Sequence, residues 1–134
     1  MLPSGLPESV ADEEPLVRFL TSDGQFNQMM AKAPAFMPGP TDARTSMFRQ
    51  PSDPVDALWA TAAREMPDRP ARAAAILDAG AVRLATLDVE ADEPPPRHAN
   101  IAGWPMVAND PEATRAKRKE LALQLAQAAI LIRR

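Results

Sequence analysis

The sequence predicts one α+β domain, in which a small sheet of short strands packs with a central helix and a long amphipathic C-terminal helix. Three observations predict it. The 134 residues are enough for one hydrophobic core but too few for two ordinary domains. Residues 53–66 and 110–132 repeat apolar side chains at helical spacing. Elsewhere, short apolar runs are bounded by the chain's 15 prolines, a pattern typical of short strands joined by stiff connections.

The N-terminal segment, residues 1–14, is acidic and aperiodic. We expect it to be a flexible arm, followed by a single α+β domain over residues 15–134. Residues 15–20 form a compact apolar run that fits either a strand or a first helical turn. Residues 25–32 fit either a short helix or the far side of a hairpin.

Residues 35–38 and 46–49 are predicted as two short extended segments, joined by a loop that contains Gly39 and Pro40. This pattern is typical of a hairpin with a longer loop. Pro38 has no backbone N–H, so the first arm is expected at an edge of the sheet.

Asp53 and Pro54 predict the start of the central helix, because aspartate caps helices and proline suits the first helical position. The helix is expected to end at Met66, before Pro67. Residues 71–77 fit a strand or a helix, and over residues 71–90 we favour a strand, a short helix and a second strand.

The same start signal, Asp110 followed by Pro111, opens the C-terminal helix, which is expected to run to about residue 132. An apolar stripe along it is expected to dock on the body of the domain. The stripe consists of Leu121, Leu125, Ala128 and Ile132.

The composition excludes several classes of function. A net charge of −3 disfavours a protein that binds nucleic acid through charge alone. Cysteine is absent, which excludes disulfides, thiolate metal sites and a cysteine nucleophile. The five glycines form no phosphate-binding loop, so we expect no cofactor. The sequence has no run of about 18 apolar residues and no leader pattern, so we expect a cytoplasmic protein with no membrane segment.

The most unusual stretch is residues 94–105, PPPRHANIAGWP, which holds the single histidine and one of the two tryptophans. Its three prolines predict an extended, polyproline-II-like entry, and Gly103 and Pro105 bracket the tryptophan. We expect a rigid loop that presents polar and aromatic side chains. The candidate binding residues are Arg97, His98, Asn100 and Trp104, together with Arg49.

His98 has three interpretations. A metal site is disfavoured, because the chain has no second histidine and no cysteine, and we expect no bound metal. A general base would need a carboxylate and the hydroxyl of Ser46 or Thr45, although no nucleophile-elbow sequence surrounds either residue. The favoured interpretation is structural: the ring nitrogens tie the loop to backbone groups.

The other candidates also have structural alternatives. Trp104 is expected to pack into the core rather than contact a ligand. Asn100 could either contact a ligand or hydrogen-bond the backbone of its own loop. For Arg97, the sequence favours neither a binding role nor a structural one. The basic run at the start of the C-terminal helix fits phosphate contacts, but acidic neighbours favour a solvated helix face. This run is Arg115, Lys117, Arg118 and Lys119.

The segments AFMP at residues 35–38, SMFR at 46–49 and RHANIAGWP at 97–105 resemble landmarks of a group of small, functionally uncharacterised bacterial proteins. The resemblance covers residues 16–130. It implies no activity and no catalytic residue. It suggests a setting in mobile-element or antiphage gene clusters.

The sequence therefore favours a small non-enzymatic protein-binding or accessory subunit, which presents residues 94–105 and the edge at 46–49 to a protein partner. The alternative is a small enzyme or nucleotide-binding domain, in which His98 acts with Arg97 and Arg49 on a phosphate or ribosyl group. The acid or base partner would then be Glu90, Asp92 or Glu93. Nucleic-acid contact through the basic run is the weakest expectation.

Overall fold

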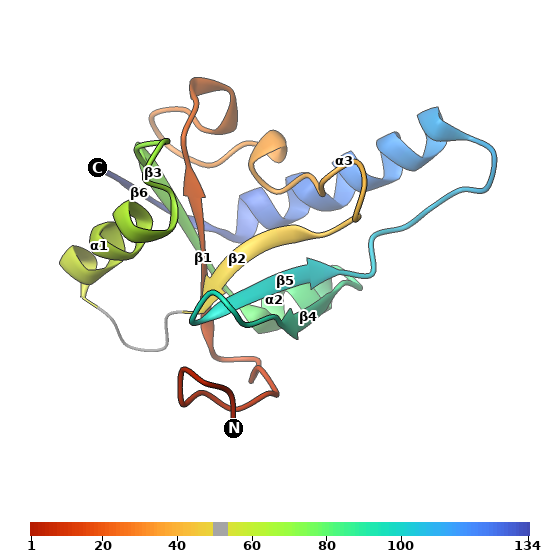
Figure 1. Cartoon of the computed structure of the whole chain (residues 1–134). Coiled ribbons are helices and arrows are strands. Elements are labelled where there is room, and N and C mark those ends of the chain that lie inside the picture. The colour runs from red at the N-terminus through yellow and green to blue at the C-terminus, as the bar shows by residue number, and fades with distance from the viewer. Residues whose placement is uncertain (50–53) are drawn as a thin grey trace.

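The computed structural model describes residues 1–49 and 54–134 and confirms the α+β class. Its strands form a six-stranded antiparallel sheet in the order β4-β5-β2-β1-β3-β6 (Figure 1). The strands are β1 (Pro15–Leu20), β2 (Thr45–Arg49), β3 (Ala73–Asp78), β4 (Asp88–Ala91), β5 (His98–Ala102) and β6 (Ile130–Arg133). The helices are α1 (Val55–Glu65), α2 (Ala79–Leu84) and α3 (Pro111–Ala128), with two short 3₁₀ turns, η1 (Asp23–Gln25) and η2 (Ala33–Ala35).

Helices cover both faces of the sheet, so the core has two layers. Figure 1 shows α1 in front of the sheet and α2 and α3 behind it. Because successive side chains of a strand point to opposite faces, each central strand supplies both layers. Val17, Phe19 and Phe48 pack with α1, whereas Leu16 and Met47 pack with α2 and α3.

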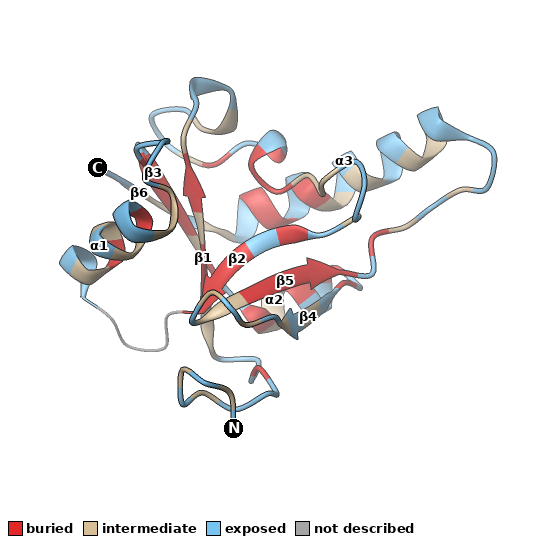
Figure 2. Ribbon diagram, viewed as in Figure 1, coloured by how far each residue is buried: buried red, intermediate tan, exposed pale blue. Residues whose placement is uncertain are grey.

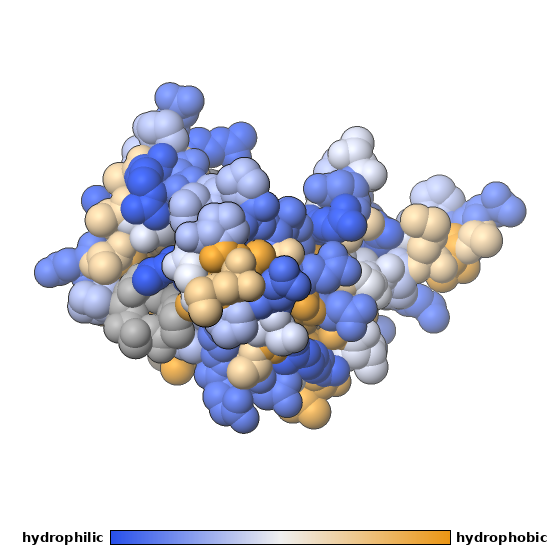
Figure 3. Space-filling model, turned by 60° about the horizontal axis from the view of Figure 1, so that its bottom comes forward, coloured by the Kyte–Doolittle hydropathy of each residue, from blue (hydrophilic) through white to orange (hydrophobic). Residues whose placement is uncertain are grey.

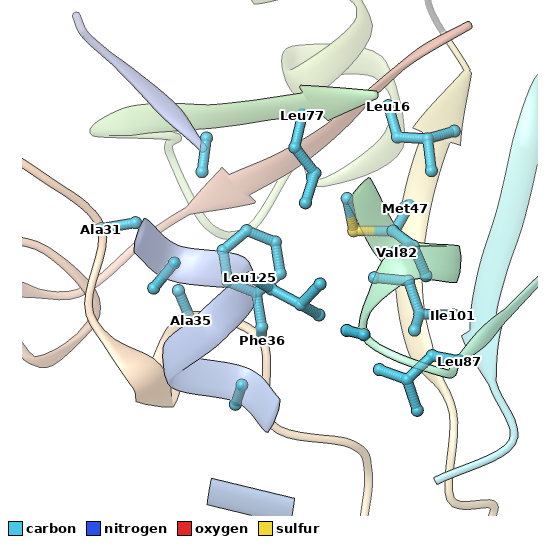
Figure 4. Packing of buried hydrophobic residues seen from close by; sticks show 14 of the residues in the cluster. Leu16, Ala31, Ala35, Phe36, Met47, Leu77, Val82, Leu87, Ile101 and Leu125 are labelled. Atoms are coloured by element: carbon cyan, nitrogen blue, oxygen red, sulfur yellow. The ribbon is translucent and has the colours of Figure 1, made fainter. Parts of the chain in front are cut away.

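The layer behind the sheet is the larger one. Figure 2 shows buried residues along the central strands and on the inner side of α3. Phe36, just after η2, is fully buried beside Leu125 of α3, and Met47, Val82 and Ile101 complete the cluster (Figure 4). Full burial of a phenylalanine side chain stabilises a fold by roughly 1.5–3 kcal/mol. The packing of Phe36 against Leu125 therefore stabilises the position of the long loop before β2 on α3.

The N-terminal segment, residues 1–14, lies against the sheet. Val10 is buried, and the backbone of Asp12 accepts a hydrogen bond from Gly80 at 2.8 Å. The main attachment is Arg49, whose side chain is fully buried. Its Nη2 donates to Glu14 Oε1 at 2.7 Å and its Nη1 to the carbonyl of Pro7 at 2.6 Å. The flexibility of this arm stays a prediction.

Several expected elements are confirmed. Residues 15–20 form a strand, and β3, α2 and β4 are the strand, short helix and strand expected over residues 71–90. The central helix is present, and its expected cap, Asp53, lies outside the described residues. Gln25 is the last residue of η1, and residues 26–32 contain neither a helix nor a regular strand; an isolated bridge joins Phe26 and Ala31.

The predicted hairpin between residues 35–38 and 46–49 is wrong. The chain turns as η2 at Ala33–Ala35, where Pro34 suits a first helical turn, and the strand at Thr45–Arg49 pairs with β5 and β1 instead. The carbonyl of Phe36 accepts a hydrogen bond from Thr45 Oγ1 at 2.8 Å. Burial of Phe36 explains the difference, because the turn directs its ring into the core.

The predicted end of the C-terminal helix is also wrong. α3 ends at Ala128, and Ile130–Arg133 adds an edge strand to β3, with Ile132 opposite Ala74. β-branched residues pack well on a pleated surface, which explains the change. Ala128 of the expected stripe is exposed, and the buried side chains of α3 are Ala122, Leu125 and Ala126.

The polyproline-II-like loop is not formed either. The prolines make a turn in which the His98 N–H donates to the carbonyl of Pro95 at 3.1 Å. Residues His98–Ala102 then form β5, inside the sheet between β4 and β2. A strand is possible here because Ala99 and Ile101 face the core.

Replacing Arg49 with methionine should lower the free energy of unfolding by about 3 kcal/mol, because it leaves the largely buried Glu14 carboxylate without its cation. Urea denaturation followed by tryptophan fluorescence measures the change. Arg64→Met, at an exposed arginine that pairs with Glu65, is the control and should change stability by well under about 1 kcal/mol. Equal stability of the two variants would show that Arg49 does not anchor the arm.

Candidate functional site

Ser46 and His98 meet on the surface of the sheet, on the face that α1 partly covers. In the β2–β5 ladder, Ser46 lies opposite Asn100 and Phe48 opposite His98. Opposed residues of antiparallel strands share a face, so the hydroxyl and the imidazole are neighbours. Ser46 Oγ lies 2.6 Å from His98 Nε2.

The second ring nitrogen of His98 determines which way this hydrogen bond runs. Nδ1 lies 2.9 Å from the backbone carbonyl of Asp92, which can only accept a hydrogen bond. Nδ1 therefore carries the proton, and in the neutral ring Nε2 is left with its lone pair. Ser46 then donates its hydroxyl proton toward Nε2. This is the arrangement in which a histidine acts as a general base toward an alcohol.

The carboxylate of Asp92 also lies near the imidazole of His98. Asp92 Oδ2 lies 3.5 Å from His98 Nδ1 and accepts a hydrogen bond from Asn100 Nδ2 at 2.8 Å. Asn100 is buried and so orients the carboxylate. The Asp92 side chain is 57% exposed, so water weakens its effect on the ring, and its backbone carbonyl is the closer partner.

A cleft of about 210 Å³ opens beside Ser46 and His98. The ring of Phe48 contacts the imidazole edge to face, with 5.4 Å between ring centroids, and limits its rotation. Ser46 is exposed, so a ligand in the cleft can reach its hydroxyl. The cleft is lined by Arg18, Phe19, Ser46, Phe48, Glu65, Met66, Pro95 and His98.

Arg18 fills the gap where β1 and β2 separate. The two strands pair only at Leu16 with Arg49 and Val17 with Phe48, so the backbone of β2 beyond this point lacks a strand partner on that side. Arg18 Nη1 donates to the carbonyl of Ser46 and Nε to that of Ala35, each at 2.9 Å. Burial lowers the pKa of Arg18 from its ordinary value, because desolvation disfavours the charged form.

The structure separates the residues that the sequence grouped together. Arg49 is on the opposite face of the sheet from His98, because Phe48 is the residue opposite His98 and Arg49 follows it in the strand. Its guanidinium is bound to Glu14 and Pro7. The predicted convergence of Arg49 and His98 on one phosphate is therefore wrong.

Of the other predicted binding residues, Trp104 and Arg97 lie away from Ser46 and His98, whereas Asn100 lies beside them. Trp104 is buried in the core and donates from Nε1 to the carbonyl of Ile101 at 3.2 Å, as the structural interpretation predicts. Arg97 lines a separate hollow beside Ser4 and Arg64. Asn100 and His98 are thus the two predicted candidates that belong to the cleft site.

Of the three carboxylates considered as acid or base partners of His98, the structure places Asp92 beside the ring and gives Glu90 and Glu93 other partners. Asp92 is beside the ring, as described above. Glu90 pairs with Arg44 at 3.8 Å, and Glu93 accepts hydrogen bonds from the backbone of Ser4 and Arg97. Within the described part of the chain, no three imidazole or carboxylate side chains gather closely enough to hold a metal ion.

The basic run lies along the first turns of α3. Arg115, Lys117 and Lys119 are exposed, and Arg118 Nε donates to the carbonyl of Pro105 at 3.0 Å. Its contact with nucleic acid stays a prediction.

Arg18 is a residue of the site that was not predicted from the sequence. One signal was available: an arginine interrupts the apolar run at residues 15–20, and a charge inside a buried strand needs polar partners. The partners themselves are distant in sequence, at Ala35 and Ser46, which no local pattern indicates.

The chain matches no family model, no curated protein and no solved structure. Over residues 1–49 and 54–134, no helix has both the length and the hydrophobicity needed to cross a bilayer.

The single histidine makes the proton position directly testable. At about pH 9, where a histidine is neutral, ¹⁵N NMR of the imidazole should show a protonated Nδ1 and an unprotonated Nε2, because the carbonyl of Asp92 requires the first proton. Ser46→Ala should leave the proton on Nδ1, since it removes only the partner of Nε2. A proton on Nε2 in the native protein would contradict this geometry.

Proposed function

We propose that this protein is a small hydrolase that uses Ser46 as a nucleophile and His98 as its general base. The observation that carries the proposal is the 2.6 Å contact between Ser46 Oγ and His98 Nε2, with the other ring nitrogen held by Asp92. A serine hydroxyl is a weak nucleophile at neutral pH unless an adjacent base takes its proton. Positioned general bases typically contribute about 10²- to 10⁴-fold in rate.

The proposed reaction is transfer of an acyl group from an ester to water. Ser46 Oγ attacks the carbonyl carbon while its proton passes to His98 Nε2, and the tetrahedral intermediate expels the alcohol, which takes that proton. Water then attacks the acyl-serine, again losing a proton to His98, and the carboxylic acid is released with Ser46 restored. Asp92 stabilises the imidazolium in both halves through its carbonyl and its carboxylate.

The cleft supports a small acyl group. Its volume of about 210 Å³ is below the roughly 300–1,000 Å³ of pockets that enclose a drug-sized ligand. Phe19, Phe48 and Met66 supply apolar wall. The alcohol side of the ester would lie toward solvent, where Ser46 is exposed.

Slow turnover is expected for this site. Ser46 lies within strand β2 rather than on the sharp strand-to-helix turn of the nucleophile elbow. The Asp92 carboxylate is also largely solvated. These features support a modest esterase activity with an observable acyl-enzyme.

A fluorophosphonate probe should label the native protein at Ser46, and p-nitrophenyl acetate should be hydrolysed above background. Ser46→Ala should abolish both, because the attacking oxygen is lost, and His98→Gln should lower hydrolysis by about 10²-fold or more. Mass spectrometry of the labelled peptide and absorbance of p-nitrophenolate measure the two effects.

The matched control is Ser22→Ala, at an exposed serine outside the cleft, which should leave labelling and hydrolysis unchanged. Labelling that persists in Ser46→Ala, or a native protein inert to both reagents, would rule out the proposed hydrolase.

A second candidate function is that of a cytoplasmic protein-binding or accessory subunit in a bacterial multi-component system of the antiphage or mobile-element type. A second hollow, of about 620 Å³, supports it. Met37, Pro38 and Met106 give it apolar wall, and Arg115 and Arg118 add basic groups. Met106 is 74% exposed. Figure 3 shows apolar surface at the right end of the molecule, on the side where the chain leads into α3 in Figure 1.

For this second function, Met106→Asp should remove a partner captured from lysate of the native host, because a charge in an apolar contact is costly to desolvate. Affinity capture with quantitative mass spectrometry measures the loss. Met29→Asp is the control, since Met29 is 86% exposed and lies outside the hollow. Equal capture by both variants would exclude this hollow as the binding surface.

A further inference from the structure

Arg18 is a cation in the wall of the cleft whose protein partners are all neutral. Its Nε and Nη1 donate to the carbonyls of Ala35 and Ser46. Among the residues that the structure describes, no carboxylate lies within 4.0 Å of the guanidinium. Arg49, whose side chain is fully buried, has the Glu14 carboxylate against it. Arg18, which is half-buried, therefore carries a positive charge that no carboxylate of the described residues pairs with.

The other charged groups of the cleft do not supply that anion. Glu65 lines the same cleft, but its Oε1 is 2.9 Å from Arg64 Nε, and its side chain is only 14% exposed. His98 is held by Ser46 and Asp92. Because Glu65 has Arg64 as its cation, it is not a partner of Arg18.

The position of Arg18 relates this charge to the nucleophile. Arg18 and Ser46 both line the cleft, and Arg18 Nη1 donates a hydrogen bond to the backbone carbonyl of Ser46. The third nitrogen, Nη2, makes no hydrogen bond to the described residues. A charge-assisted bond from an arginine to a carboxylate is roughly twice as strong as a neutral hydrogen bond.

We infer that Arg18 binds a carboxylate on the acyl group of the substrate, so that the substrates are half-esters of short dicarboxylic acids. The anion site rests on the geometry of Arg18 alone, whereas the assignment of the substrate also rests on the proposed hydrolase function. Burial of Arg18 supports the inference, because an anion restores the interaction that desolvation removes. The small cleft restricts the acid to a short chain.

The hydrolysis experiment compares mono-p-nitrophenyl succinate with p-nitrophenyl acetate, which lacks the carboxylate and the methylene that carries it. The native protein should show a kcat/KM on the order of tenfold higher for the succinate half-ester. Arg18→Gln should lower the ratio of the two kcat/KM values to about one, whatever its effect on the acetate ester alone, and Arg18→Lys should keep part of the preference. An equal loss on both esters would instead make Arg18 a stabiliser of the reaction's oxyanion and overturn the inference.

A binding experiment tests the anion site without catalysis. In Ser46→Ala, succinate should produce saturable NMR shifts of the single histidine at constant ionic strength, whereas succinamide, its uncharged isostere, should produce none. Arg18→Gln in the same background should abolish the shifts, and if that double variant fails to fold, the comparison of succinate with succinamide decides alone.

The two experiments separate the two claims. Binding of succinate by a protein that hydrolyses neither ester would keep the anion site and reject the hydrolase. Hydrolysis without preference for the succinate ester, with no binding of succinate, would keep the hydrolase and reject the role of Arg18.

Discussion

Strand β2 pairs with β5 at four positions but with β1 at only two, and much of the molecule depends on this difference. Where β2 leaves β1, backbone groups lose their strand partners, and buried backbone groups must be bonded elsewhere. Arg18 supplies one such bond, to the carbonyl of Ser46, and the side chains of Arg18 and Thr45 bond the carbonyls of Ala35 and Phe36 in the neighbouring loop. The separation of the two strands therefore both places a cation beside Ser46 and admits the loop that fills the core behind the sheet.

Alternate side chains of β2 point to opposite faces of the sheet, one toward the core and one toward the cleft. Thr45, Met47 and Arg49 face the layer of α2 and α3, where they are buried. Ser46 and Phe48 face the other side, where α1 leaves part of the sheet uncovered and the cleft opens. One strand of five residues thus carries a core face and a face that lines the cleft, and a shift of its register by one residue would exchange them.

Local signals in the sequence predicted much of the fold. The proline after Asp110 predicted the start of α3, and the alternation after Thr86 predicted β4. The pairing of strands was not predictable in this way, because Ser46 pairs with Asn100, a residue far from it in the sequence. The same limit applies to the site. His98 and its possible hydroxyl partners were identified, but their contact depends on the β2–β5 register, and Arg49 was misplaced by one step of strand alternation.

The short strand β4 lies at the edge of the sheet and pairs with β5 alone. Directly after it, the N–H of Asp92 donates to the carbonyl of His98 at 2.9 Å, while the carbonyl of Asp92 holds the imidazole. Edge elements with few buried contacts open at a lower free energy than the core does. Each such opening would release the ring and let its proton redistribute between the two nitrogens. For the proposed hydrolase, the fraction of molecules in which Nε2 can accept the Ser46 proton would therefore depend on the local stability of β4 rather than on that of the whole domain.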